Sequence, residues 1–409
     1  MRASSFTALL LASACATSLQ SNQDMSPEDA EELFSARFER TRTRRTGDGI
    51  GQYDTLAPVA GAPNAAPLPK ASNPTAVLSQ ETLDAATQFA GRNNSSALMI
   101  WKDGELIAEA YFEGFDRDSM LVSRSLAKPL SVIAVGRAVA QGHISTIDDP
   151  VADYISEWKG TPKEAIRIRD LLGMHSGLLP QAAAPDKDNI LNKAYLHPFH
   201  DEIIVNDYPM VAEPGTVYGY SNATGDLLAI LIERAAGKSY EDWLTEDVFT
   251  PLGAAGGEIW MNRPGGTPHA GCCILLPAET YLRLGILLSQ SGEWNGRQLL
   301  TPEFVEAMKT PGVDFENAGM GLYLGTPYRE WRGASGNTDT PMLNSSWHSE
   351  PFLADDLILF DGNSTQVVYI VPSEQLVILR TGDHPPKDPQ WDNAYLPNLV
   401  LSDLAGRSD

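Results

Sequence analysis

Cysteine is scarce in this chain: only three of its 409 residues are cysteines. Cys15 falls in a leader-like segment, and the other two, Cys272 and Cys273, are neighbours. So few cysteines at these spacings exclude a disulfide framework and a zinc-finger type of site. Adjacent cysteines rarely pair with each other, so we expect Cys272 and Cys273 to be buried thiols that pack as small hydrophobic side chains.

Basic residues are also in deficit. The chain has 30 Lys and Arg against 53 Asp and Glu, a formal net charge of −23. Such a surface repels phosphate backbones, which excludes nucleic acid as the expected partner. Hydrophobic residues make up 43% of the chain and charged residues 20%, an ordinary globular composition. After the leader, no segment is long and apolar enough to cross a bilayer.

The N-terminus is typical of an export signal. Arg2 precedes a short apolar run over residues 6–14, too short to span a membrane. Residues 12–15 resemble a bacterial lipobox, which would place a lipid on Cys15 and attach the protein to a membrane. Residues 14–16 also fit ordinary signal cleavage, which would release a soluble protein. We expect an exported protein, either in the periplasm or as an outer-membrane lipoprotein.

The chain divides into three parts by pattern. Residues 1–16 form the leader. Residues 17–78 hold a helix, starting at the Ser26-Pro27 cap signal and running to about Arg40, and then a Pro- and Ala-rich linker. Residues 79–409 form the main domain, with no internal repeat.

Strand patterns lie at both ends of the main domain and helical patterns lie between them. A hairpin is predicted from two apolar runs around Lys102-Asp103-Gly104-Glu105. The other predicted strands are 356–360, 366–371 and 376–380, and the predicted helices are 82–92, 130–141, 168–174, 224–236, 240–249, 277–289 and 302–309. The simplest packing is one antiparallel sheet flanked by helices, an α/β (α+β) fold, with a helical insertion over about 145–310.

A nucleophile candidate stands at the start of the first long apolar helix. Ser125-Leu126-Ala127-Lys128 places a hydroxyl and an amine three residues apart, on one face of a helix. Pro129 favours a position in the first helical turn, where the backbone is electropositive and stabilises an oxyanion. A second match, Ser156 to Lys159, is interpreted as surface.

Tyr220-Ser221-Asn222 is the only Tyr-x-Asn in the chain. A serine hydroxyl attacks a carbonyl at neutral pH only when a base takes its proton. A buried lysine, or a tyrosine held close to a cation, can do so. We therefore group Tyr220 with Ser125 and Lys128. The Gly-x-Ser-x-Gly elbow of α/β-hydrolases is absent from the sequence.

These motifs together resemble the class C β-lactamase-related serine hydrolases, which include penicillin-binding peptidases, carboxylesterases and linear-amide hydrolases. Further matching stretches are 142–151, 168–172, 175–178, 214–216 and 251–253, and the likeness covers roughly Gln80 to Leu401. The resemblance implies a β-lactamase/transpeptidase-like fold, acylation of Ser125, a proton shared by Lys128 and Tyr220, and a substrate positioned by Asn222. It implies no metal or organic cofactor and a small-molecule ester or amide as substrate.

The third family motif departs from the pattern. The family usually carries Lys or His, then Thr or Ser, then Gly, whereas this chain has Phe360-Asp361-Gly362. The spacing after Gly362 and the presence of Gln366 resemble the esterase and amide-hydrolase branch. Gly362, Asn363 and Gln366 are therefore our candidate substrate-binding residues, with a second oxyanion donor at a backbone N–H near Asn363. Without the usual cation, β-lactam hydrolysis is not expected as the main activity.

Two other classes remain open at this point. A non-catalytic binding protein for cell-wall fragments could retain the same fold, and a β-lactamase is a further alternative. A metalloenzyme using His197 and His200 is disfavoured because Pro198 prevents a helical pair and no zinc motif surrounds them. We expect those two histidines to pack within a loop.

Overall fold

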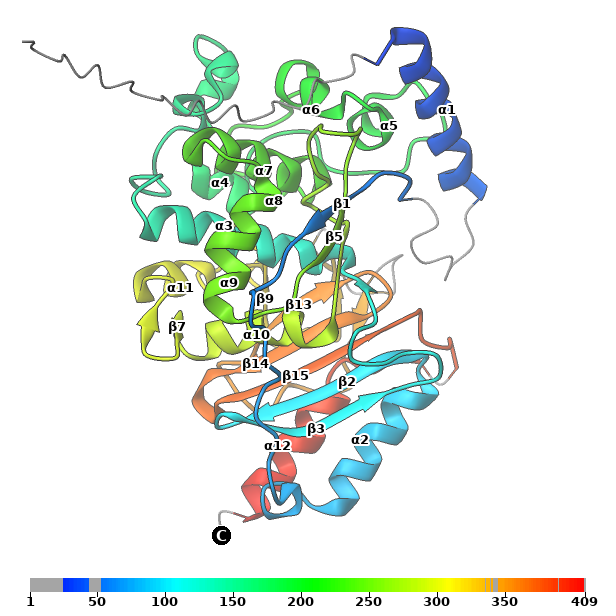
Figure 1. Ribbon diagram of the computed structural model, residues 1–409, viewed down its shortest axis with the longest axis vertical. Coiled ribbons are helices and arrows are strands. Elements are labelled where there is room, and N and C mark those ends of the chain that lie inside the picture. The colour runs from blue at the N-terminus through cyan, green and yellow to red at the C-terminus, as the bar shows by residue number, and fades with distance from the viewer. Residues whose placement is uncertain are drawn as a thin grey trace, which may run out of the picture.

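The largest sheet is six-stranded and antiparallel, and it lies between the helical part of the molecule and helices α2 (Gln80–Arg92) and α12 (Tyr395–Arg407) (Figure 1). The computed structural model describes residues 25–43, 53–334, 336–338, 340, 345–388 and 390–407. The strand order is β3-β2-β15-β14-β13-β9. The strands are β2 (Ser95–Lys102), β3 (Glu105–Tyr111), β9 (Tyr323–Leu324), β13 (Ile358–Gly362), β14 (Gln366–Val371) and β15 (Leu376–Gly382). Because β15 pairs with β2, the two ends of the main domain meet in one sheet, and the expected fold class is confirmed.

The predicted hairpin joins β2 and β3. Its turn residues Asp103 and Gly104 have φ values of 50° and 97°, the left-handed conformation that a tight hairpin turn needs. Every residue of β14 is buried, because helices cover both faces of the sheet. Helices α2 and α12 lie against one face.

Helix α10 (Ala278–Ser289) covers the opposite face of the sheet. It approaches closely at Gly285, where an added Cβ would lie 2.8 Å from Val368 and 2.9 Å from Val377. The glycine therefore sets the spacing between helix and sheet. On its outer side α10 borders the helical insertion, so the sheet and the insertion share one core.

The helical part of the molecule reaches beyond the predicted insertion, because it includes α3, and it is built around α3 and α7, which pack against each other (Figure 1). Its helices are α3 (Ala127–Ala140), α4 (Ile168–Leu172), α5 (Ile190–Leu196), α6 (His200–Glu202), α7 (Asn222–Ala236), α8 (Tyr240–Trp243), α9 (Thr250–Leu252) and α11 (Pro302–Met308). Single-turn 3-10 segments are η1 (Pro74–Ala76), η2 (Arg124–Leu126), η3 (Val151–Asp153), η4 (Ser156–Trp158), η5 (Pro162–Ala165) and η8 (Pro372–Glu374), and π-helical turns are η6 (Ile203–Asp207) and η7 (Leu244–Phe249). The predicted helix over 240–249 thus begins as α8 and continues as η7.

Short strands that the sequence did not predict complete the fold. A four-stranded sheet has the order β1-β5-β6-β4, and two smaller sheets pair β7 with β8 and place β10 between β11 and β12. The strands are β1 (Leu56–Val59), β4 (Leu121–Val122), β5 (Gly257–Trp260), β6 (Ile274–Leu276), β7 (Glu293–Trp294), β8 (Arg297–Gln298), β10 (Trp331–Gly333), β11 (Gly336–Thr338) and β12 (Ser346–Trp347).

The N-terminal segment is more structured than a linker. Helix α1 (Pro27–Thr43) forms as predicted, and Ser26 Oγ accepts a hydrogen bond from Asp29 N at 3.1 Å. The predicted linker, however, begins with strand β1, which pairs with β5, and Leu68 N donates to Glu279 Oε1 on α10 at 3.1 Å. Backbone pairing to a distant strand, invisible in local composition, fixes this stretch. The predicted leader with Cys15 lies outside the described residues.

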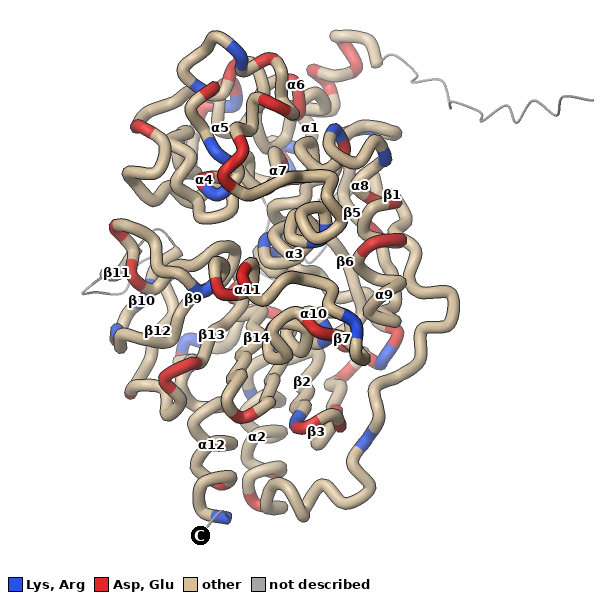
Figure 2. Tube along the Cα trace, turned by 90° about the vertical axis from the view of Figure 1, so that its left-hand side faces the viewer, with Lys and Arg blue, Asp and Glu red and all other residues tan. Residues whose placement is uncertain are grey.

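Acidic and basic residues are spread over both the helical part and the sheet part of the chain trace (Figure 2). Within the part of the chain that the structure describes, no helix has both the length and the apolar character needed to cross a bilayer.

Candidate active site

The nucleophile candidate Ser125 lies in η2, two residues before α3 begins, and beside the end of strand β13. Arg124, just before it, has a φ of 48°, a conformation that non-glycine residues adopt rarely. An added Cβ on Gly362 would lie 3.0 Å from Ser125 N, so only a residue without a side chain lets β13 approach this closely. Because of this turn at Arg124, and because Gly362 has no side chain at the end of β13, Ser125 Oγ faces a cavity.

Three residues that the sequence grouped together are neighbours in space. Tyr220 Oη lies 2.6 Å from Ser125 Oγ, and Lys128 Nζ lies 3.3 Å from the same oxygen. Lys128 Nζ also lies 4.6 Å from the centre of the Tyr220 ring. The cation therefore borders both the hydroxyl and the phenol, and a proton can move between Ser125 and Tyr220 without a bridging group.

Lys128 is almost fully buried, at 4% exposure. Besides Ser125 Oγ, its ammonium group donates to Asn222 Oδ1 at 2.6 Å and to the Gly271 carbonyl at 2.5 Å. A lysine ammonium has three N–H donors and no acceptor. All three donors are therefore satisfied, which is how a buried charge without a carboxylate partner is accommodated.

Asn222 is the first residue of α7, and its backbone N–H donates to Gln181 Oε1 at 3.1 Å. Its side chain is held by Lys128, and the residue lines the same cavity as Ser125. Asn222 thus stands between the lysine and the space that a substrate would occupy. Gln181, which steadies it, was not singled out from the sequence because it belongs to no motif.

The cavity has a volume of about 440 Å³. It is lined by five of the seven predicted site residues, which are Ser125, Tyr220, Asn222, Gly362 and Asn363, while Lys128 lies behind them. Gln366 is placed elsewhere: it is 1% exposed, its Nε2 donates to the carbonyl of Gly382, and its Oε1 accepts from Gly382 N at 3.0 Å. Its side chain links β14 to β15 and does not reach the cavity.

The third motif presents an acid rather than a cation. Phe360 is buried at 1% exposure, and the neighbouring Asp361 lines the cavity. Arg332 forms an ion pair with Asp361, and Ser346 Oγ donates to the same carboxylate at 2.9 Å. The guanidinium of Arg332 lies 3.9 Å from the centre of the Tyr323 ring. No short sequence motif marks Arg332 as a residue of the site.

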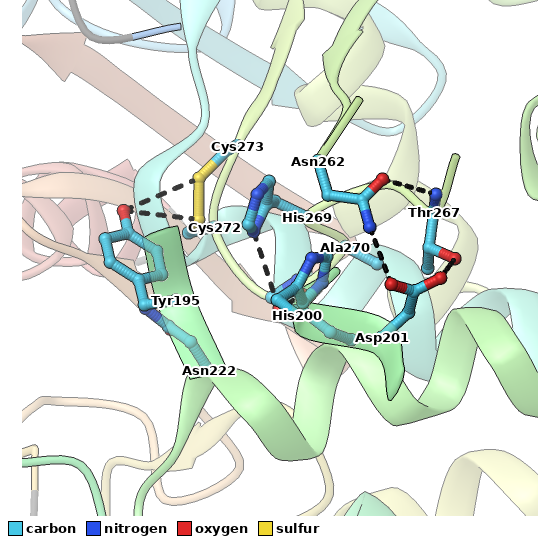
Figure 3. A network of polar contacts seen from close by, with 12 residues as sticks. Tyr195, His200, Asp201, Asn222, Asn262, Thr267, His269, Ala270, Cys272 and Cys273 are labelled. Atoms are coloured by element: carbon cyan, nitrogen blue, oxygen red, sulfur yellow. Dashed lines mark hydrogen bonds and ion pairs between the residues drawn. A yellow bond between two sulfur atoms is a disulfide. The ribbon is translucent and has the colours of Figure 1, made fainter. Parts of the chain in front are cut away.

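The expectation of free thiols at positions 272 and 273 is wrong, although both residues are buried as predicted. Cys272 and Cys273 form a disulfide with each other. Both of their backbone N–H groups donate to the carbonyl of His269, and this tight turn brings the two sulfur atoms to one side. Figure 3 shows the Tyr195 hydroxyl directed at both sulfur atoms, at 3.7 Å from Cys272 and 3.9 Å from Cys273.

Behind Lys128 lies a second polar cluster, made of His200, Asp226 and His269, each at 0% exposure. Burial lowers the pKa of His200 and of His269 to about 3. Burial also raises the pKa of Asp226 to about 6. Asp226 Oδ1 accepts from Gly271 N at 2.9 Å, which connects this cluster to the carbonyl that receives Lys128.

The comparisons with known proteins agree with this architecture. The 6-aminohexanoate-dimer hydrolase of Paenarthrobacter ureafaciens is 22% identical over 235 residues, covering 53% of this chain and 58% of the relative. A solved structure from Bacillus anthracis, provisionally named a 6-aminohexanoate-dimer hydrolase, aligns with a TM-score of 0.62 and 18% identity over 91% of this chain and 93% of that one. A class C beta-lactamase solved with cefoxitin aligns with a TM-score of 0.55 and 15% identity over 81% of this chain and 99% of that one. The beta-lactamase family model matches residues 81–396, and the chain therefore belongs to the beta-lactamase family and has its class C-like fold.

Proposed function

We propose that this protein is a serine hydrolase that cleaves small esters or linear amides through an acyl-enzyme on Ser125. The observation that carries the proposal is the pair of distances at Ser125 Oγ, 2.6 Å to Tyr220 Oη and 3.3 Å to Lys128 Nζ. Such a hydroxyl has a proton acceptor and a cation within reach, as an activated nucleophile requires.

The hydrogen bonds of the lysine favour Tyr220 as the group that takes the serine proton. The three N–H donors of Lys128 point at three acceptors, which leaves no lone pair for a further proton. Lys128 Nζ also lies 4.6 Å from the centre of the Tyr220 ring, so the cation is next to the group that receives the proton. Ser125 Oγ then bonds to the substrate carbonyl, its proton passes to Tyr220, and Tyr220 returns it to the departing alcohol or amine. Water then attacks the carbonyl of the acyl-enzyme, with Tyr220 taking its proton and returning it to Ser125 Oγ, and the acid is released.

The tetrahedral intermediate needs donors for its oxyanion. In this proposal they are the backbone N–H of Ser125, at the electropositive start of α3, and the backbone N–H near Asn363 at the end of β13. Both residues line the cavity. The close approach of Gly362 to Ser125 N supports this arrangement.

The surroundings of the third motif support esters and linear amides as substrates. The position at which the family usually carries a cation is the buried Phe360. Arg332, a guanidinium that lines the cavity, is already paired with Asp361. A substrate carboxylate would have to compete with Asp361 for that charge. The name of the Paenarthrobacter relative, a linear-amide hydrolase, agrees with this substrate class. Nitrocefin hydrolysis tests the alternative of a β-lactamase.

The test is Ser125→Ala, with Ser156→Ala as matched control. Ser156 begins the other Ser-x-x-Lys and is exposed, far from the site in sequence. We expect a fluorophosphonate to add mass to the wild type and to Ser156→Ala but not to Ser125→Ala, and hydrolysis of p-nitrophenyl butyrate to follow the label. An unlabelled, inactive wild type that still binds cell-wall fragments would replace this proposal with a binding protein.

We also propose that the chain is exported. The leader over residues 1–16 supports this, through its short apolar run and small residues. The intact mass of the mature protein separates a lipid on Cys15 from simple cleavage after the leader, and an uncleaved N-terminus in cell extracts would contradict export.

A further inference from the structure

Part of the active-site cavity is built by residues that precede the family match. The beta-lactamase family model begins at residue 81, yet Tyr53 lines the same cavity as Ser125. Tyr195 and Cys272 line this cavity as well. We call Tyr53, Tyr195 and the disulfide of Cys272 and Cys273 the aromatic wall. The proposed reaction assigns no role to it.

The aromatic wall packs on Trp260, which is fully buried. The Tyr53 ring stacks on the indole, with centroids 5.1 Å apart and planes 26° apart, and the Tyr195 ring meets the indole edge-on at 5.8 Å. Trp260 also belongs to the same apolar cluster as Tyr53, Cys272 and Cys273. One buried indole therefore fixes both tyrosine rings relative to the disulfide.

Helix α1 anchors the Tyr53 part of the wall. Arg37 lies on α1, is 1% exposed, forms an ion pair with Asp54 at 2.7 Å and donates to the carbonyl of Asn262 at 2.8 Å. Trp260 Nε1 donates to the Asp54 carboxylate at 3.1 Å. Because Asp54 directly follows Tyr53, these bonds hold the tyrosine at the cavity. The N-terminal helix, which precedes the family match, thus supports one part of the active-site cavity.

The aromatic wall is uncharged, in contrast to the third motif. The disulfide has no S–H group to donate or to ionise, and the Tyr195 hydroxyl is directed at its sulfur atoms (Figure 3). The third motif, in the same cavity, carries the ion pair of Arg332 and Asp361. Aromatic rings and sulfur atoms favour contact with hydrocarbon groups. The wall therefore suits an apolar part of a substrate.

The position of Tyr220 indicates which part of the substrate this is. In the proposed reaction Tyr220 returns a proton to the departing alcohol or amine, so the leaving group must lie at its hydroxyl. Tyr220 borders a small side cavity of about 20 Å³, and the described residues that line this side cavity include Tyr323 and Asp361 but no member of the aromatic wall. A leaving group on that side directs the acyl group toward the wall.

We infer that the aromatic wall binds the acyl group of the substrate and selects apolar acyl chains. This inference rests on the proposed function, because it assumes an acyl-enzyme on Ser125. Burial of one methylene group strengthens binding by a factor of about four. Each methylene of the acyl chain that contacts the wall should therefore raise kcat/KM about fourfold.

The experiment measures kcat/KM of the full chain for p-nitrophenyl acetate and p-nitrophenyl butyrate. Butyrate has two more methylene groups than acetate, so the wild type should prefer it by roughly 10-fold. Tyr53→Ala removes the ring and should lower this preference at least threefold, while kcat/KM for the acetate changes less. Tyr53→Phe keeps the ring and should keep the preference.

Tyr395→Ala is the matched control, because Tyr395 also stacks on an aromatic ring, that of Phe89, at 4.3 Å. It lies on α12, on the face of the sheet opposite α10. We expect this variant to keep the wild-type preference for butyrate, and circular dichroism verifies that each variant is folded. A preference that falls equally in Tyr395→Ala would overturn the inference, because the loss would then reflect general destabilisation.

Other outcomes separate the inference from the proposed function. A wild type that a fluorophosphonate labels on Ser125, but that hydrolyses acetate and butyrate equally well, would overturn the inference and leave the proposed function in place. So would a folded Tyr53→Ala with the wild-type preference. A change in Tyr53→Ala that is confined to a series of acetate esters of different alcohols would place the leaving group at the wall instead. A wild type with neither label nor hydrolysis would contradict the proposed function, and the inference with it.

Discussion

Tyr220→Phe isolates the proton transfer that the active site is proposed to perform. The substitution removes one oxygen, 2.6 Å from Ser125 Oγ, and leaves the ring that borders Lys128 Nζ. A positioned general base contributes a factor of about 10² to 10⁴ in rate. The acylation barrier should therefore rise by roughly 3–5 kcal/mol. Lys128 cannot take over, because its three donors remain engaged with their acceptors.

The assay is the pre-steady-state burst of p-nitrophenol from p-nitrophenyl butyrate, which reports acylation separately from deacylation. The matched control is Tyr111→Phe, the same chemical change on strand β3 at the opposite edge of the sheet, where the hydroxyl donates to Glu109. We expect the control to keep the wild-type burst and Tyr220→Phe to lose it by at least 100-fold. A burst in Tyr220→Phe within threefold of wild type, with Ser125→Ala inactive, would refute Tyr220 as the base.

Three further predictions concern stability. In Gly136→Ala the new Cβ would lie 2.5 Å from Phe304 Cε1, which is too close for two non-bonded carbon atoms. The free energy of unfolding in urea should therefore fall by about 1–3 kcal/mol. An unchanged unfolding midpoint would contradict this packing. Arg380→Met removes a fully buried guanidinium that donates to four backbone carbonyls and one serine hydroxyl. Its free energy of unfolding in urea should therefore fall by roughly 3–5 kcal/mol. A fall of less than about 1 kcal/mol would show that the loop after β13 does not depend on Arg380. Burial raises the pKa of Glu233 to about 7 from an ordinary 4.5, so its contribution to the unfolding free energy is complete below pH 4.5 and is lost as the pH rises through 7. This loss of unfolding free energy with rising pH is no more than about 3 kcal/mol. It should be smaller in Glu233→Gln. If the unfolding free energy of the variant depends on pH in the same way as that of the wild type, the carboxyl is not held protonated.

Local patterns predicted the secondary structure of the main domain well. Turn residues at positions 103 and 104 fixed the β2–β3 hairpin, and apolar periodicity marked α3 and α7. The prediction failed where pairing is long-range. Strand β1 lies in a segment whose proline and alanine content is typical of a linker, and only its partner β5, about 200 residues later, makes it a strand.

The candidate site shows the same division. Ser125 and Lys128 are one helical turn apart, so their proximity follows from local geometry. The spacing of the third motif suggested that Gln366 would face the substrate. The structure instead places its amide against the backbone of Gly382. The register between neighbouring strands decides which face of the sheet a side chain points to, and the sequence of one strand does not fix that register.

The sequence determined which chemical groups each short motif supplies. These are the hydroxyl and amine of Ser125 and Lys128, the phenol and amide of Tyr220 and Asn222, and a strand end that lacks a side chain at Gly362. Tertiary structure alone decided that Tyr220 lies against Ser125, that Arg332 neutralises Asp361, and that two histidines and an aspartate meet in the core. The physical reason is that helix and turn geometry extend over a few residues, whereas contacts between distant segments depend on how whole faces pack together.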